Sequence, residues 1–109
     1  MATTYKVLGQ VNPSATTATT LYTVPAATQT VVSTISVCNQ ASSAATYRIA
    51  VRPAGATLEA KHYIVYGATV AASDTTTLTL GITLATTDVV TVYASSANLS
   101  FNAFGSEIA

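Results

Sequence analysis

Charged side chains are scarce in this chain. Four of its 109 residues are Lys or Arg and four are Asp or Glu, or 7%, whereas an ordinary soluble domain is about a quarter charged. The formal net charge is zero, and no basic cluster is present to neutralise phosphates, so the composition argues against a nucleic-acid partner. A net charge near zero also promotes association of a free monomer. The scarcity of charge therefore favours a part of a larger assembly over a freely diffusing enzyme.

Cysteine and long apolar runs are scarce as well. Cys38 is the single cysteine, which excludes an internal disulfide and a cysteine-based zinc site and fits synthesis in a reducing cytoplasm. The first residues, MATTYKVLGQ, contain no apolar run behind a positive start, so we expect no secretory signal. No stretch approaches the ~20 apolar residues of a membrane helix, and we expect no membrane partner.

Residues that could carry catalysis are few and dispersed. His62 is the only histidine, and with Cys38 it forms the sole possible nucleophile–base pair, which nothing in the spacing supports. A packed or interface role is favoured for both. The acids stand singly in turns: Glu59, Asp74, Asp88 and Glu107. Clustered carboxylates would be needed for acid–base catalysis or a calcium site. We therefore expect no enzyme activity, cofactor or metal.

Threonine dominates what is present, with 21 residues, and it is β-branched and suited to strands. Period-two alternation predicts an all-β fold: one antiparallel, jelly-roll-like β-sandwich of about eight short strands over residues 1–109, with an N-terminal strand and loop in residues 1–18. A short, Gly-interrupted helix over Ala54–Lys61 is the alternative for that segment. The predicted strands are Thr4–Val11, Thr19–Val24, Gln29–Cys38, Ala45–Arg52, Lys61–Tyr66 (continued by Thr69–Ala72 after a kink at Gly67), Thr75–Ile82, Val89–Ala94 and Asn98–Phe104.

The alternation also assigns side chains to the core. The first strand places Tyr5, Val7 and Val11 on one face, and the aromatic residues are expected to anchor the packing. The other positions predicted to face inward are Val31, Ile35, Val37, Tyr47, Ile49, Val51, Thr76, Leu78, Leu80, Ile82, Leu99, Phe101 and Ala103. Because alternation points Tyr63 and Tyr66 in opposite directions, we expect one of them to meet a partner.

Two arginines and the C-terminal strand supply further contact candidates. Arg48 and Arg52 share one strand face about 13 Å apart, at about 3.3 Å per residue, which is too far to hold one small anion. They could pair with two carboxylates across an interface or lie on a solvated outer face. Phe104 and Ile108 are out of phase with the core positions of their strand and are expected to project. The candidate interface therefore comprises Arg48, Arg52, Tyr63, Tyr66, Phe104 and Ile108.

Segments spread over residues 19–108 together resemble a small module of tailed-bacteriophage virions, common among phages of cyanobacteria and other aquatic hosts. They are LYTVP (Leu21–Pro25), VVSTISVCN (Val31–Asn39), TYRIAVRP (Thr46–Pro53), HYI (His62–Ile64), DTTTLTLGI (Asp74–Ile82), DVVTVYA (Asp88–Ala94) and LSFNAFGSEI (Leu99–Ile108). The resemblance implies a virion structural protein without a catalytic motif. Modules of this kind occur on the head, as decoration or cement, and on the tail or its fibres.

The favoured interpretation is a capsid cement or decoration protein, located in the virion and bound to the major capsid protein or other virion proteins. A homo-oligomer is expected, with a trimer favoured. The alternative is a tail-, neck- or fibre-associated module. A carbohydrate-binding sandwich that engages host polysaccharide is a third class, supported only by the six tyrosines. An enzyme ranks last.

Overall fold

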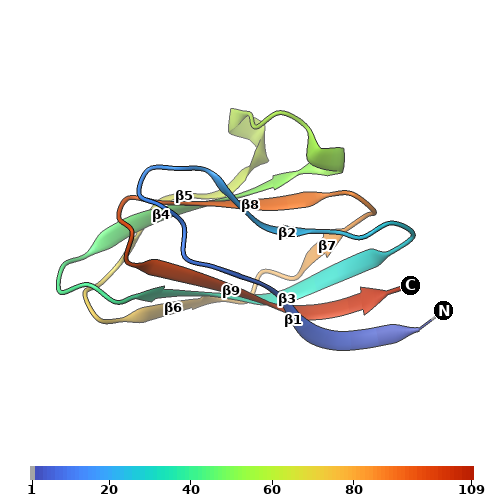
Figure 1. The fold of residues 1–109 in the computed structure, drawn as a ribbon, viewed down its shortest axis with the longest axis horizontal. Coiled ribbons are helices and arrows are strands. Elements are labelled where there is room, and N and C mark those ends of the chain that lie inside the picture. Colours follow the sequence, from blue (N-terminus) through green and yellow to red (C-terminus); the bar gives the residue numbers. More distant parts are fainter. Residues whose placement is uncertain (1) are drawn as a thin grey trace.

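The computed structural model describes residues 2–109, and two antiparallel sheets pack face to face in it (Figure 1). Two short 3-10 turns, η1 (Pro53–Gly55) and η2 (Ala60–His62), lie in the longest connection. The nine strands are β1 (Thr3–Val11), β2 (Thr19–Thr23), β3 (Gln29–Asn39), β4 (Ala45–Arg52), β5 (Tyr63–Val70), β6 (Thr75–Leu78), β7 (Ile82–Leu84), β8 (Val89–Ala94) and β9 (Leu99–Ile108).

The strand order is that of a jelly roll. Sheet A has the order β1-β9-β3-β6, with β7 also paired to β3, and sheet B has the order β2-β8-β4-β5. Since β6 and β7 pair with successive parts of β3, they are one interrupted strand of an eight-stranded, double-sheet jelly roll. The predicted all-β, jelly-roll-like sandwich is confirmed.

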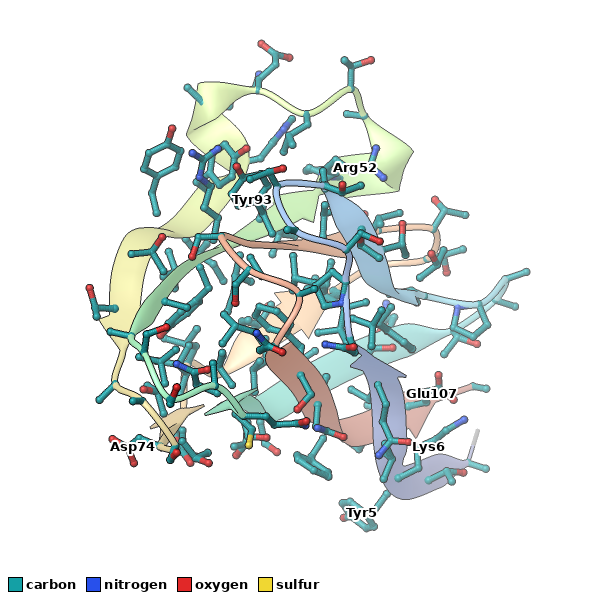
Figure 2. The ribbon with its side chains drawn as sticks, turned by 60° about the vertical axis from the view of Figure 1, so that its left-hand side comes forward. Tyr5, Lys6, Arg52, Asp74, Tyr93 and Glu107 are labelled. Carbon is teal, nitrogen blue, oxygen red and sulfur yellow. The ribbon has the colours of Figure 1, made fainter. Side chains whose placement is uncertain are left out.

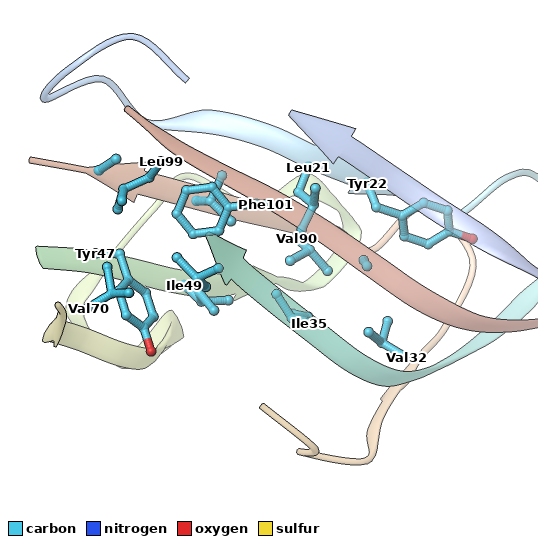
Figure 3. Close-up of a cluster of buried hydrophobic side chains, with 14 of the residues drawn as sticks. Leu21, Tyr22, Val32, Ile35, Tyr47, Ile49, Val70, Val90, Leu99 and Phe101 are labelled. Carbon is cyan, nitrogen blue, oxygen red and sulfur yellow. The ribbon is translucent and has the colours of Figure 1, made fainter. Parts of the chain in front are cut away.

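The core lies between the two sheets and is built from the inward side chains of each strand (Figure 3). Ile35 and Phe101 from sheet A meet Ile49 and Tyr47 from sheet B, all at most 2% exposed. The Tyr47 and Phe101 rings meet edge to face with centroids 6.2 Å apart. Burying one such side chain contributes roughly 1.5–3 kcal/mol, so these layers supply the main stabilisation.

A bulge in β3 changes which residues face the core. The pairing with β9 skips Ser33, so that Thr30 and Val32 point inward before the bulge, whereas Ile35 points inward after it. The predicted inward positions Ile35 and Val37 are confirmed. The prediction for Val31 is wrong, because the extra residue reverses the alternation within one strand.

A second bulge, at Leu8, has the same effect on β1. The pairing with β9 jumps between Val7 and Gly9, so the alternation reverses along the strand. Val11 packs against the core, while Tyr5 is 84% exposed and Val7 is 46% exposed. Tyr5 is therefore not a core anchor, and the shared face predicted for these three residues is wrong.

The segment predicted as one strand over Thr75–Ile82 is interrupted. Residues 79–81 leave the ladder, and Gly81 adopts a positive φ of 62°. Leu80 is 45% exposed there, so its predicted inward position is wrong. The chain turns away from β3 at this point and rejoins it as β7.

The connection after β4 contains no α-helix, so the helical alternative for Ala54–Lys61 is wrong. The two 3-10 turns lie at the ends of this connection. The following strand begins at Tyr63 instead of Lys61 and continues to Val70 without stopping at Gly67. Gly67 has φ +72° and is skipped in the pairing with β4, so it forms a bulge that suits glycine.

Candidate functional site: two outer faces

The outer face of sheet A carries three exposed apolar side chains, Tyr5, Val7 and Phe104. The other large apolar residues exposed within residues 2–109 are Ile64, Tyr66 and Leu80. Tyr5 and Val7 come from β1, and the register places Val7 beside Phe104 of β9. Phe104 is 38% exposed, and a cleft of about 390 Å³ separates it from Tyr5. We call this surface the sheet A face; its outward residues on β1, β9 and β3 include Tyr5, Val7, Asn102, Phe104, Ser106, Ile108, Val31, Ser33, Thr34 and Ser36.

No charged side chain from the strands of sheet A, as far as residues 2–109 describe it, lies on the sheet A face. Lys6 and Glu107 are the only charged residues in these strands. Alternation in the register directs their 3.2 Å ion pair to the side that faces sheet B, although the Lys6 side chain is 45% exposed there and Lys6 also borders the cleft. The Tyr22 hydroxyl, from sheet B, donates to Glu107 and shares a 2.7 Å hydrogen bond with Thr30. The exposed surface is therefore apolar at its centre and hydroxyl- or amide-bearing around it.

The pKa values of Glu107 and Tyr22 reflect this arrangement. The hydrogen bond from Tyr22 lowers the pKa of Glu107, and Lys6 lowers it further, against the opposing effect of burial. Burial, with the hydrogen bond to Glu107, raises the pKa of Tyr22 to about 12. Both groups thus keep their ordinary charge states at neutral pH and close one end of the sandwich.

The outer face of sheet B holds both arginines and three tyrosines. The Arg48 guanidinium lies 4.3 Å from the ring centroid of Tyr66 and 4.2 Å from that of Tyr93. Arg52 donates from Nε to the Thr91 hydroxyl at 3.1 Å, and its Nη1 donates to the carbonyl oxygens of residues 55 and 56. Both arginines are therefore engaged within the monomer, in contrast to a freely solvated outer face.

Residues 53–62 fold over part of this surface and cover it. The Asp88 carboxylate accepts a hydrogen bond from the Ala54 amide at 2.9 Å. At the other end, His62 is 7% exposed, and its Nδ1 accepts the Glu59 amide at 3.0 Å. Thr91, although it points outward from β8, is only 6% exposed beneath this cover. We call this surface the sheet B face; its outward side chains include Arg48, Arg52, Tyr63, Tyr66, Val89, Thr91 and Tyr93.

The structure corrects the prediction for the tyrosine pair on β5. Tyr63 and Tyr66 do not point in opposite directions: their rings are in edge-to-face contact with centroids 5.0 Å apart. The cause is a bulge, because the pairing with β4 skips Ile64 and brings both tyrosines to one side. The two rings line a cleft of about 640 Å³ that is completed by Leu58, Glu59 and Ala60.

The six interface candidates thus fall on two opposite surfaces. Arg48, Arg52, Tyr63 and Tyr66 share the sheet B face, whereas Phe104 and the half-buried Ile108 belong to the sheet A face. Figure 2 shows Arg52 and Tyr93 on the side of the molecule away from Tyr5 and Lys6.

The sequence did not indicate that Tyr5 belongs to the sheet A face and Tyr93 to the sheet B face, because both were expected, with the other aromatic residues, to anchor the core. Tyr93 pairs directly with the outward Arg48, and this register could have indicated its position had the order of the strands been known. Tyr5 carried no such signal, because its orientation depends on the bulge at Leu8.

The residues considered for chemistry are not brought together. Cys38 lies on β3 in sheet A, and His62 lies in the cover over sheet B. Among residues 2–109 no three His, Cys, Asp or Glu side chains form a group that could hold a metal ion. No helix in the same range is long and apolar enough to span a membrane. Comparison of the sequence with protein-family models and with curated proteins finds no match.

Proposed function

We propose that this protein is a non-enzymatic structural protein of a bacteriophage virion, and specifically a capsid cement or decoration protein that stabilises the head shell. The observation that carries the proposal is the sheet A face, where Tyr5, Val7 and Phe104 are exposed on strands with no outward charge. The centre of a protein interface is depleted of charge and enriched in aromatic residues. Contiguous exposed apolar surface likewise marks contact sites.

The fold supports this proposal by analogy. Double-sheet jelly rolls occur in viral capsid domains, although they also occur in lectins and cupins, so the fold alone does not select the function. The ladder between β1 and β9 continues to Ala2 and Ala109, which exchange two backbone hydrogen bonds of 2.7 and 3.0 Å. A small sandwich of this kind can repeat the same contact at many equivalent places on a shell.

The partner that fits the sheet A face is an equally uncharged surface of the major capsid protein, with a closed homotrimer as the bound form. Closed symmetry limits runaway association of an apolar surface. Such contacts keep their strength at high salt, because screening weakens exposed ion pairs and hardly affects apolar burial.

Copy number and shell stability test the proposal. We expect the protein in purified particles at a stoichiometry close to that of the major capsid protein, measured by quantitative mass spectrometry. Particles that lack it should release their genome at a lower temperature than complete particles. A count of about tens per particle, with normal head stability and defective adsorption on deletion, would move the protein to the tail, neck or fibres.

A further inference from the structure

The cleft on the sheet B face is not used by the proposed cement role, which rests on the opposite surface. We propose that this cleft, lined by Leu58, Glu59, Ala60, Tyr63 and Tyr66, binds an uncharged pyranose ring of a polysaccharide. Its volume of about 640 Å³ lies within the 300–1,000 Å³ typical of small-ligand sites. The proposal stands independently of the virion role.

The aromatic walls provide the first part of the argument. Tyr66 is 65% exposed and Tyr63 is half-buried, and the edge-to-face contact between them fixes both rings. Neither phenol hydroxyl hydrogen-bonds to another of the described residues, so both remain available to a ligand. The face of an aromatic ring is negative and attracts the weakly positive C–H groups of a sugar ring, while the hydroxyls exchange hydrogen bonds with those of the sugar.

The second part is the carboxylate of Glu59, which lines the cleft. The backbone of this residue is held at the start of η2: its carbonyl oxygen accepts the His62 amide at 3.1 Å, and its own amide donates to His62 Nδ1 at 3.0 Å. A carboxylate has about four acceptor positions, so several remain for hydroxyl groups of a ligand. An anionic ligand, in contrast, would be repelled by this charge at close range.

The third part is Arg48, which excludes cationic ligands. Tyr63, Tyr66 and a carboxylate would otherwise form a cage suited to a quaternary ammonium group. The Arg48 guanidinium already lies 4.3 Å from the Tyr66 ring centroid, and it has no carboxylate within ion-pair distance among residues 2–109. Arg48 does not line the cleft, but its charge beside the Tyr66 ring disfavours a cation there, and Glu59 disfavours an anion. A neutral, hydroxyl-rich ligand avoids both repulsions.

The test is an NMR titration of the ¹⁵N-labelled full chain with three neutral probes, maltohexaose, cellohexaose and laminarihexaose. We expect saturable shifts of the amides of residues 58–66 with at least one of them. Tyr66→Ala should weaken that binding at least about tenfold, and Glu59→Gln should weaken it measurably. Tyr66 is largely exposed, so the fold of Tyr66→Ala can be verified in the same spectra.

Tyr5→Ala is the matched control, since it removes an exposed tyrosine from the opposite surface. It should bind the oligosaccharide as the wild type does, and loss of capsid binding in Tyr5→Ala would concern the virion role alone. Oligogalacturonate and choline serve as acidic and cationic probes. No saturable shift with any neutral probe, unchanged binding in Tyr66→Ala, or tighter binding of either charged probe would overturn the proposal.

Discussion

Sheet A and sheet B leave their outer surfaces in different states. On the sheet B face, residues 53–62 fold back over the strands, bury Thr91 and hydrogen-bond to Arg52 and Asp88. On the sheet A face nothing from residues 2–109 covers Tyr5, which is 84% exposed beside Val7 and Phe104. The monomer therefore covers part of the sheet B face with its own chain and leaves the centre of the sheet A face uncovered.

The placement of charge follows the same division. Both arginines belong to the sheet B face, where aromatic rings and backbone carbonyls hold them. The two charged residues in the strands of sheet A, Lys6 and Glu107, are turned inward and paired. The sheet A face is thus the surface whose strands carry no outward charged side chain, and it is the surface suited to a large apolar contact.

The inward-facing sides of the two sheets should contribute equally to stability, although their outer surfaces differ. Substitutions on these inner sides have the largest expected effect. Ile35→Ala and Ile49→Ala remove fully buried side chains from sheets A and B and should each lower the free energy of unfolding by about 2–5 kcal/mol. Chemical denaturation measures both values. Thr77→Ala, on the outer side of β6, is the control and should cost well under this. A loss at Thr77 as large as that at Ile49 would refute the assigned register.

The contacts that Arg48 makes on the sheet B face predict a measurable loss of stability when this side chain is removed. Arg48→Ala deletes two cation–π contacts and the packing of the side chain, and should cost about 1–2 kcal/mol in the free energy of unfolding. Ser36→Ala, on the sheet A face, should stay within about 0.5 kcal/mol. Equal effects of the two substitutions would remove the contrast between the surfaces.

The hydrogen bond between Tyr22 and Glu107 should make an acid-sensitive contribution to the free energy of unfolding. The folded-state pKa of Glu107 lies below its ordinary value of 4.5, so its contribution is fully present above that pH and is lost as pH falls through the folded pKa. Tyr22→Phe removes the hydrogen bond that lowers this pKa most, and should reduce the stability by about 1 kcal/mol at neutral pH and flatten the acid limb. Thermal unfolding between pH 2 and 7 measures the slope. An acid limb unchanged in the variant would contradict the assignment.

The smallest expected effect on stability comes from the most exposed side chain. Tyr5→Ser should change the free energy of unfolding by less than about 0.5 kcal/mol, because Tyr5 touches little of its own chain. The same substitution should shift the wild-type oligomer towards monomer in sedimentation velocity, at both low and high salt. Tyr66→Ser is the matched control and should sediment as the wild type does. The reverse result would assign self-association to the sheet B face.

Much of the fold could be predicted from alternation alone. The bounds of β4 and β8 match the predicted strands, and Tyr47, Ile49, Leu99 and Phe101 are buried as expected. These strands have no bulge within the part that faces the core, so a period of two holds along each of them.

The errors at Tyr5, Val31 and the Tyr63–Tyr66 pair have one physical cause. Single skipped residues at Leu8, Ser33 and Ile64 reverse the alternation within a strand, and each depends on how the neighbouring strand is paired. Local sequence does not contain that information, because pairing joins residues far apart in the chain. The grouping of Arg48 with Tyr93 and of Tyr5 with Phe104 required the strand order for the same reason.

Hydroxyl-radical footprinting of the protein, free and within purified virions, tests the central claim that neighbours cover the sheet A face. We expect Tyr5 and Phe104 to be oxidised readily in the free protein and to be protected in the particle, while Tyr66 is oxidised in both. Protection of Tyr66 with Tyr5 and Phe104 still reactive, or absence of the protein from the particle, would contradict it.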